Sequence, residues 1–195
     1  MRIHRTTKAA ALAAVVTLAL AACSSDGGGD AATQSGDTDR TVSAEAYMNT
    51  LCGELQTWLT SLQEGAQSIS GQLAGAEAEQ GRQVIGAYLD DAISATQEAA
   101  AALGEAGVPD VEGGAEAAQA AVDGLDQVEQ VFTDARAAVE ELPDDKAGFK
   151  AGATAIGTQI QSALADNPLT ALEDNSALAE AESQAEACVA LNAAT

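Results

Sequence analysis

The sequence predicts an all-α domain, an antiparallel up-down bundle of four long helices with a shorter helix at its C-terminal end. Two observations support this. Residues 41–195 are rich in Ala, Glu, Gln and Leu, and their apolar residues recur at the three- and four-residue spacing of an amphipathic helix. The three prolines, at positions 109, 143 and 168, stand between the predicted helices. Long helices joined by short connections are expected to alternate in direction.

The chain begins with the parts of an export leader. Arg2, Arg5 and Lys8 form a positively charged start, and no acidic residue occurs before Asp26. Residues 9–20 then form an apolar run interrupted only by a threonine. A run this short cannot cross a bilayer as a helix, which needs roughly 20 residues. It therefore fits the apolar core of a secretory signal peptide.

A short motif, Leu20-Ala21-Ala22-Cys23, closes this leader. It resembles the lipobox of bacterial lipoproteins, in which a diacylglyceryl group is attached to the cysteine thiol and the chain is cut just before that residue. The resemblance implies that residues 1–22 are a lipoprotein signal peptide and that lipidated Cys23 holds the protein on the extracytoplasmic face of the cell membrane. The alternative is an ordinary signal peptide with an incidental cysteine. Because there is no Arg-Arg pair, we expect the general secretory route.

Residues 23–40 are predicted to be the lipidated cysteine and a tether. The segment 24–40 consists mainly of Gly, Ser, Asp, Thr and Ala and has no hydrophobic periodicity, which is typical of a disordered linker. A flexible chain of this length spans roughly 20–25 Å. It would keep the single domain of residues 41–195 close to the membrane.

The chain is strongly acidic, with 30 Asp and Glu against 8 Lys and Arg. Three of the bases and none of the acids lie in the leader, so five bases and a formal charge of −25 (5 − 30) remain after residue 22. Such a surface repels nucleic acid and anionic headgroups. We therefore expect no nucleic-acid partner, and we expect membrane affinity to come from the lipid on Cys23. The acidity is interpreted as a solubility feature, with a surface for cations or a basic partner as the alternative.

Two long helices are predicted in the first half of the domain. The first spans about residues 43–69 and the second about residues 80–104. Between them, Gly71, Gly75 and Gly81 weaken the helix, so this stretch is expected to be partly loop. The apolar stripes of these helices are Met48, Leu51, Leu55, Leu59 and Leu62, followed by Ile85, Tyr88, Leu89, Ala92, Ile93, Thr96, Ala99 and Leu103.

Three further helices are predicted in the second half. The connection to the third helix is expected to be a turn with Gly107 as C-cap and Asp110 as N-cap. The third helix spans about residues 111–142, the fourth about 145–165 and the shorter fifth about 176–191. Their stripes are Ala118, Val122, Leu125, Val128, Phe132, Ala135, Val139 and Leu142; Phe149, Ala153, Ile156, Ile160 and Leu164; and Leu178, Ala181, Ala185, Cys188 and Leu191.

Cys52 and Cys188 are predicted to form a disulfide. They are the only cysteines besides Cys23, and exported proteins meet oxidising conditions. In an up-down bundle the fifth helix starts at the same end as the first. The two cysteines then lie roughly 14 and 18 Å from that end, within one turn of each other. The alternatives are two buried thiols or a redox pair, and the latter lacks a C-x-x-C motif.

The residue inventory excludes most catalytic and metal sites. The only histidine is His4, inside the leader, which removes Ser-His-Asp and Cys-His catalysis and His-ligated metals from the domain. No phosphate-binding glycine motif and no calcium-binding loop occurs. We therefore predict no catalytic residue, no metal site and no cofactor, and a protein that is not an enzyme.

Adjacent carboxylates occur at three places: Asp90/Asp91, Glu140/Glu141 and Asp144/Asp145. Neighbouring residues on a helix point about 100° apart, so such a pair does not converge on one site. Asp144 and Asp145 are interpreted as charges at a helix N-terminus, where the helix dipole favours them.

Five aromatic residues follow the leader: Tyr47, Trp58, Tyr88, Phe132 and Phe149. Each is interpreted as a core residue and not as a ligand contact. The Ala-rich stripes let helices approach closely, and they leave little room for the cavity that a small ligand needs. Trp58, at the edge of its stripe, is the aromatic residue we would test first for ligand contact.

The lipobox, polar tether, Ala-rich helices and one cysteine near each end of the domain together resemble small exported helical lipoproteins of actinobacterial type. That resemblance implies a location in the cell envelope and a helical architecture, but no activity. The first hypothesis is a membrane-anchored, non-enzymatic interaction or scaffold module with a protein partner in the cell envelope. The alternative is a small-ligand or cation-binding lipoprotein that serves a transporter or sensor.

Overall fold

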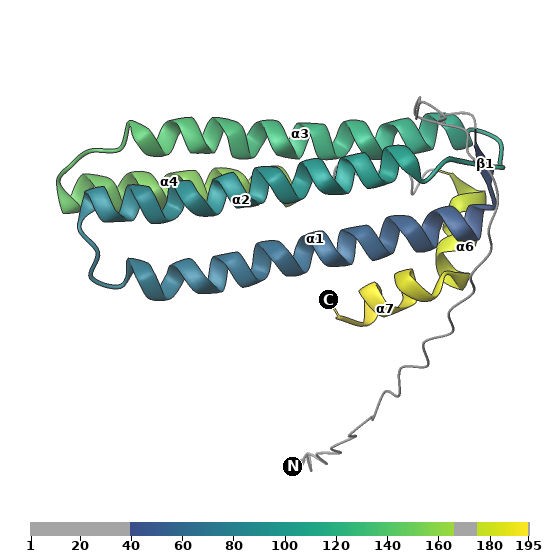
Figure 1. Ribbon diagram of the computed structural model, residues 1–195, viewed down its shortest axis with the longest axis horizontal. Coiled ribbons are helices and arrows are strands. Elements are labelled where there is room, and N and C mark those ends of the chain that lie inside the picture. The colour runs from purple at the N-terminus through teal and green to yellow at the C-terminus, as the bar shows by residue number, and fades with distance from the viewer. Residues whose placement is uncertain (1–39, 166–174, 195) are drawn as a thin grey trace, which may run out of the picture. The chain divides into compact units, whose positions relative to one another are not determined.

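The computed structural model describes residues 40–165 and 175–194, and the predicted all-α class is confirmed (Figure 1). None of the helices in these ranges is long and apolar enough to cross a lipid bilayer. The long helices are α1 (Ala44–Leu73), α2 (Ala78–Glu105), α3 (Gly114–Glu140) and α4 (Lys146–Ala165). The short elements are α6 (Ser176–Gln184), α7 (Glu186–Ala194) and the two strands β1 (Thr41–Val42) and β2 (Val108–Pro109).

Side chains and glycines mark the ends of the long helices. α1 begins after Ser43, whose hydroxyl oxygen accepts a hydrogen bond from the Ala46 N–H at 3.2 Å. α2 ends before Gly107, whose φ of 92° is one that glycine adopts readily. α4 begins after Asp145, whose carboxylate accepts from the Gly148 N–H at 2.9 Å. The interpretation of Asp145 as an N-terminal helix charge is therefore confirmed.

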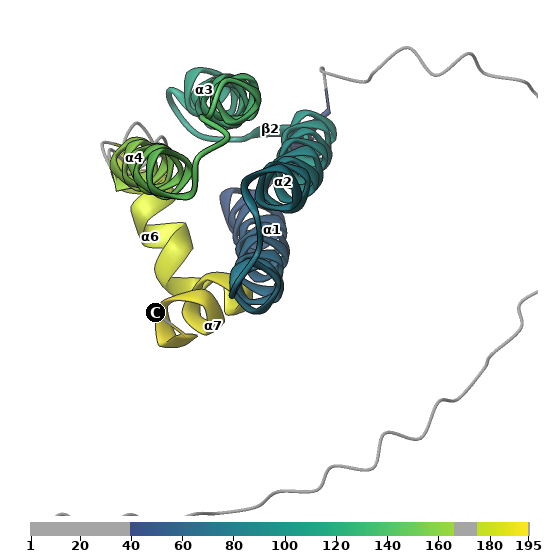
Figure 2. The same ribbon diagram turned by 90° about the vertical axis from the view of Figure 1, so that its left-hand side faces the viewer.

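Successive long helices pack side by side and alternate in direction (Figure 1). α2 packs against both α1 and α3, and α4 packs against α3. α1 and α4 do not pack closely on each other, and they lie apart in the view along the helices (Figure 2). The four helices are therefore joined as three packed pairs, and one side between α1 and α4 is open.

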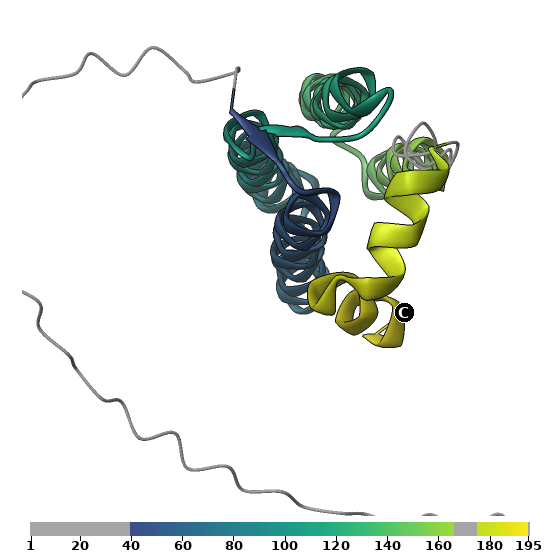
Figure 3. The same ribbon diagram turned by 90° about the vertical axis from the view of Figure 1, so that its right-hand side faces the viewer.

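The two short helices cover this open side at one end. α6 runs across from the α4 side to α1, and α7 then follows the first part of α1 (Figures 1 and 3). Asn175 fixes the start of α6, because its side-chain oxygen accepts from the Ala177 and Leu178 N–H groups. The Asn175 amide also donates to the Glu112 carbonyl at 3.0 Å, which ties this start to the segment before α3.

The core contains the predicted apolar stripes, which are buried or half-buried at every position except Leu59, which is 42% exposed. Between α1 and α2 the Trp58 indole N–H donates to the Thr96 hydroxyl at 2.9 Å, and that hydroxyl donates to the Ala92 carbonyl at 2.8 Å. Both side-chain polar groups are thus satisfied, which makes their burial compatible with an apolar core.

α1 continues past its predicted end at Ile69, through Gly71 to Leu73. Leu73 lies four residues after Ile69, so both are on the same side of the helix, and both are half-buried. The apolar face thus extends across a glycine that costs about 1 kcal/mol in a helix interior. The expected loop is confined to residues 74–77.

The connection from α2 to α3 is not the predicted turn with Asp110 as N-cap. β2 instead pairs in parallel with β1, and the Asp110 N–H donates to the Val42 carbonyl at 2.8 Å. α3 begins only at Gly114. Arg40, which was assigned to the tether, donates from its guanidinium to the Glu105 carbonyl at 2.9 Å, at the end of α2. Local sequence could not indicate this, because the pairing strand is distant along the chain.

The predicted single helix over residues 176–191 is two helices, α6 and α7. Ala185 lies between them in extended backbone, with φ −71° and ψ 119°, and is fully buried. The break turns the chain so that Leu178 on α6 and Cys188 on α7 are both buried. Periodicity does not reveal it, because Ala185 keeps the apolar spacing and alanine favours helix.

Candidate ligand pocket between three helices

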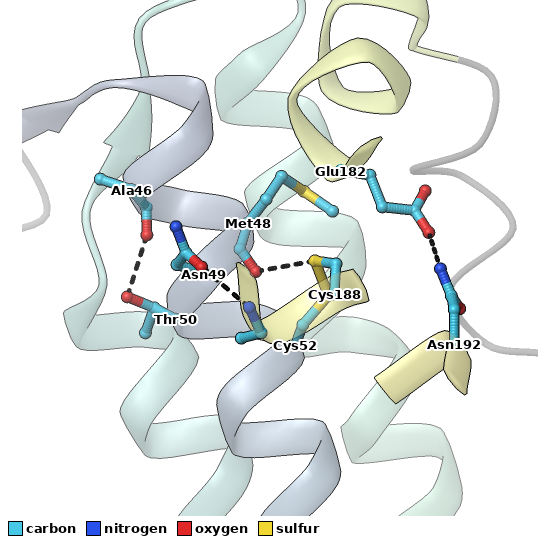
Figure 4. The surroundings of a disulfide bond; sticks show 9 residues. Ala46, Met48, Asn49, Thr50, Cys52, Glu182, Cys188 and Asn192 are labelled. Carbon is cyan, nitrogen blue, oxygen red and sulfur yellow. Dashed lines mark hydrogen bonds between the residues drawn. A yellow bond between two sulfur atoms is a disulfide. The ribbon is translucent and has the colours of Figure 1, made fainter. Parts of the chain in front are cut away.

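Cys52 of α1 and Cys188 of α7 form a disulfide, as predicted, with their Cα atoms 5.0 Å apart (Figure 4). One turn earlier on α1, the Asn49 side-chain oxygen accepts from the Ala187 N–H at 3.1 Å and caps the start of α7. The Cys188 sulfur also lies 3.2 Å from the Met48 carbonyl oxygen. Because a disulfide sulfur carries no proton, this approach is a contact and not a hydrogen bond. α7 is thus attached to α1 at two neighbouring points.

A pocket of about 540 Å³ lies between α1, α2 and α4, and this volume is in the range of small-ligand sites. It lies against the last part of α1, roughly 25 Å along the helix from Cys52. α7 ends before this region and leaves it uncovered (Figure 1). The large apolar side chains that line the pocket are Ile69 and Leu73 of α1, Ile85, Tyr88 and Leu89 of α2, and Phe149, Ile156 and Ile160 of α4.

Two glycines make room for the aromatic rings of this lining. A Cβ atom at Gly81 of α2 would collide with the Phe149 ring, and one at Gly65 of α1 would lie 2.7 Å from the Tyr88 ring. Because neither glycine has a side chain, each ring can lie against the backbone of the neighbouring helix. The sequence indicated Gly81 only as a residue that weakens a helix, since the ring it accommodates is on another helix.

The interior of the pocket is apolar. Leu89, Phe149 and Ile156 are all buried. The Tyr88 hydroxyl is half-buried and donates to the Leu62 carbonyl of α1 at 3.4 Å. Burial raises the pKa of the Tyr88 phenol, so this group is neutral at physiological pH. The Tyr88 hydroxyl is thus bonded to Leu62, which does not line the pocket, and the interior offers apolar surface without charge.

The mouth of the pocket is cationic. Lys146 and Lys150 are exposed residues of α4 that line the pocket, and no acidic residue does. Residues four apart on a helix lie on the same side, with Cβ atoms about 5–6 Å apart. Both ammonium groups can therefore reach one ligand at the mouth.

The pocket contradicts the expectation that Ala-rich stripes leave little room. α4 packs against α3 and stands away from α1, and the space between them is the pocket. Trp58, the aromatic residue we would have tested first, does not line it. Tyr88 and Phe149, which the sequence predicts to be core residues, are half-buried and buried, and they also line the pocket.

In each adjacent pair of carboxylates, only one member forms an ion pair with a described residue. The Arg136 guanidinium pairs with Asp90 at 3.0 Å and with Glu140 at 2.7 Å. Arg82 pairs with Asp144 at 2.6 Å. Within the part of the chain that the structure describes, no three His, Cys, Asp or Glu residues are grouped so that they could hold a metal ion.

Comparison of the chain with protein-family models, with curated proteins and with solved structures finds no match. The predicted lipidation site, Cys23, falls in residues 1–39, which lie outside the described residues.

Proposed function

We propose that this protein is a lipid-anchored lipoprotein of the extracytoplasmic membrane face and that its helical domain binds a small apolar ligand. The observation that carries the binding role is the pocket of about 540 Å³, with its apolar interior and cationic mouth. An apolar cavity with a few polar groups is the usual form of a small-molecule site. Each ligand CH₂ group buried there would contribute about 0.8 kcal/mol. Ligand binding, the alternative from the sequence, thus becomes the leading hypothesis.

The anchoring role rests on the lipobox at Leu20-Ala21-Ala22-Cys23. Two acyl chains hold a protein stably on a membrane, whereas one does so only marginally. The chain after residue 22 has a formal charge of −25, so its surface would not bring it to an anionic membrane by itself. The disulfide between Cys52 and Cys188 supports export, because such bonds persist in oxidising compartments.

We propose that the domain acts without catalysis. The ionisable residues that line the pocket are Tyr88, Lys146 and Lys150, a set without a nucleophile and base pair. Ligand binding ranks above the hypothesis of an interaction or scaffold module, because the described surface shows little that a protein partner would cover. The large apolar side chains exposed on the described surface are Leu59 and Val189, and single exposed residues of this kind need no partner.

We also propose that α1 to α4 form an antiparallel up-down bundle that is open between its first and fourth helices. α6 and α7 would fill the opening at one end, and the ligand would fill it at the other. Because such a ligand binds the folded state only, it should raise the melting temperature in a concentration-dependent way.

Gly157 offers a direct test of the pocket. It lines the pocket from α4, and a Cβ atom there would meet no other atom within 4 Å. Gly157→Phe should therefore fill the pocket with its ring. It should not destabilise α4, because phenylalanine favours a helix interior more than glycine does. We expect the wild-type protein to bind the neutral apolar dye Nile red with a rise in fluorescence, and Gly157→Phe to lose most of that signal.

Gly157→Ala is the matched control for this experiment. It gains about the same helix propensity but adds only a methyl group, so we expect it to keep dye binding. Circular dichroism and thermal melting show whether each variant is folded. Equal dye binding by wild type and a folded Gly157→Phe would rule out the pocket as the binding site.

A further inference from the structure

α4 differs in charge from every other described helix. Residues 146–165 contain no Asp or Glu, whereas each of the other described helices carries acidic residues. α4 also holds Lys146 and Lys150, which are the only lysines after residue 22. The chain after residue 22 has five basic and 30 acidic residues, so α4 is a positively charged helix in an otherwise acidic chain. Its two lysines lie beside the apolar pocket.

This placement does not serve the stability of the helix. Lys146 is the first residue of α4 and Lys150 lies one turn later. The N-terminal end of a helix carries a partial positive charge, so cations are disfavoured there and anions are favoured. The terminus itself is already capped by the Asp145 carboxylate, so the two lysines are the groups that attract an anion to the mouth of the pocket.

Neither lysine forms an ion pair with another described residue, since the ion pairs found there are all made by arginines. The acids nearest to Lys146 in sequence have other partners. Asp144 pairs with Arg82 at 2.6 Å, and Asp145 accepts a hydrogen bond from the Gly148 N–H at 2.9 Å. No acidic residue stands three or four positions from either lysine on α4. Both ammonium groups are thus available to a ligand.

We propose that the ligand is a single-chain amphiphile with an anionic head, either the carboxylate of a fatty acid or the phosphate of a monoacyl phospholipid. Its acyl chain occupies the pocket beside Phe149 and Ile156, and its head lies at Lys146 and Lys150. The chain supplies most of the affinity, about fourfold for each CH₂ group buried. The lysines select the sign of the head, because an ammonium forms strong charge-assisted hydrogen bonds with carboxylate or phosphate. This inference rests on the proposed ligand-binding function and adds the chemical class of the ligand.

Three ligands with one chain and different heads test the proposal: dodecanoate, dodecanol and dodecylamine, each used as monomer to displace Nile red. The net charge of the protein favours the cationic amine, whereas the two lysines favour the carboxylate. We expect dodecanoate to bind tightest, at least about threefold tighter than dodecanol, with dodecylamine weakest. Equal binding of all three, or tightest binding of the amine, would overturn the anionic head and leave the pocket itself intact. Wild-type protein that binds neither dye nor amphiphile would instead refute the proposed binding function.

The double variant Lys146→Gln/Lys150→Gln tests the role of the lysines. Both side chains are exposed, so the fold should be unaffected. We expect dodecanoate to bind about three- to tenfold more weakly and dodecanol to bind as before, because only the carboxylate interacts with the charges. The variant Lys146→Arg/Lys150→Arg keeps both charges and should retain the preference for dodecanoate. An equal loss for dodecanoate and dodecanol would mean that the lysines only shape the pocket, which would overturn the proposal.

The two sources of such a ligand are distinguished by comparing dodecanoate with a lysophosphatidylglycerol that carries a dodecanoyl chain. Tighter binding of dodecanoate identifies a free fatty acid, and tighter binding of the lysophospholipid identifies a membrane-lipid fragment. In both cases the preferred ligand should bind more weakly to Lys146→Gln/Lys150→Gln. A preferred ligand that is insensitive to this substitution would contradict the proposal.

Discussion

Tyr47 is fully buried, yet its hydroxyl has no hydrogen-bond partner among the described residues. A buried hydroxyl without a partner costs about 1–3 kcal/mol relative to its hydrated state. Tyr47→Phe keeps the ring in the core and removes that group. We therefore expect the free energy of unfolding at neutral pH to be unchanged or raised by about 1 kcal/mol, as measured by urea denaturation. A clear loss of stability would show that the hydroxyl is hydrogen-bonded.

The same variant should differ from wild type in alkali. Burial raises the pKa of Tyr47 from 10.0 to about 12, so in this range the unfolded chain releases the proton and the folded chain keeps it. The stability that depends on the neutral phenol is complete below pH 10.0 and is lost as the pH rises toward about 12. Tyr47→Phe should lose less stability over this interval. A residual loss is expected, because the pKa of Tyr88 is also raised.

At the residue scale, the sequence predicted which side chains are apolar and buried, but not which of them border a cavity. Trp58 and Phe149 both lie on amphipathic helices, and nothing local distinguishes them. Trp58 is buried, and its indole N–H donates a hydrogen bond to the Thr96 hydroxyl of α2 at 2.9 Å. Phe149 borders the pocket because Gly81 on α2 accommodates its ring. In each case the deciding neighbour comes from another helix, which periodicity along one helix cannot indicate.

At the scale of elements, the disulfide between Cys52 and Cys188 should hold α7 on α1. The bond closes a loop with a sequence separation of 136, for which the chain-entropy estimate is about 5 kcal/mol. We expect Cys52→Ala/Cys188→Ala to lower the free energy of unfolding by up to that amount, as measured by urea denaturation. Mass spectrometry of the wild type should show a gain of two hydrogens on reduction, and equal masses would refute the bond.

Asn49→Ala is the matched variant for this contact. It removes the cap of α7 and leaves the disulfide in place, so the expected loss is only about 1 kcal/mol. Nile red binding should survive the cysteine substitutions in the folded protein, because α7 does not line the pocket. Loss of dye binding at temperatures where the variant is folded would contradict this separation of the two ends.

The four long helices were predictable from the sequence, whereas the end of α1, the start of α3 and the division of the last helix were not. α1 extends across Gly71 because Leu73 continues its apolar side, and the α6–α7 break occurs at Ala185, a residue that favours helix. The predicted heights of the cysteines assumed one straight helix parallel to α1. The pair nevertheless forms, because α6 carries the chain across to α1 and α7 then brings Cys188 beside Cys52. The cysteine count and the predicted export therefore indicated the bond better than the assumed geometry did.

At the scale of the whole molecule, the all-α class follows from periodicity, but the separation of α1 from α4 does not. Any amphipathic helix of suitable length could have packed between α1 and α4. The C-terminal helices cover the opening only beside the first part of α1 and leave the rest to the pocket (Figure 1). The two lysines of α4 can be read from the sequence, but their position beside a pocket cannot. That position depends on the fold, which brings Ile69 and Leu73 of α1 to the same pocket as α4.

The proposed anchor can be tested on the full chain through Cys23→Ala. The thiol is the group to which the lipid would be attached, and the acidic surface supplies no other attraction to an anionic membrane. We expect the variant to leave the membrane fraction, or to remain as a precursor that is larger by the uncleaved leader, as judged by fractionation and immunoblotting. Ser24→Ala, one residue further on, is the control and should fractionate like wild type. If Cys23→Ala stays in the membrane fraction at mature size, the cysteine is incidental and the leader is an ordinary signal peptide. The domain would then be held at the membrane by something other than a lipid on residue 23, so this result would change how the domain is attached but not how it binds the ligand.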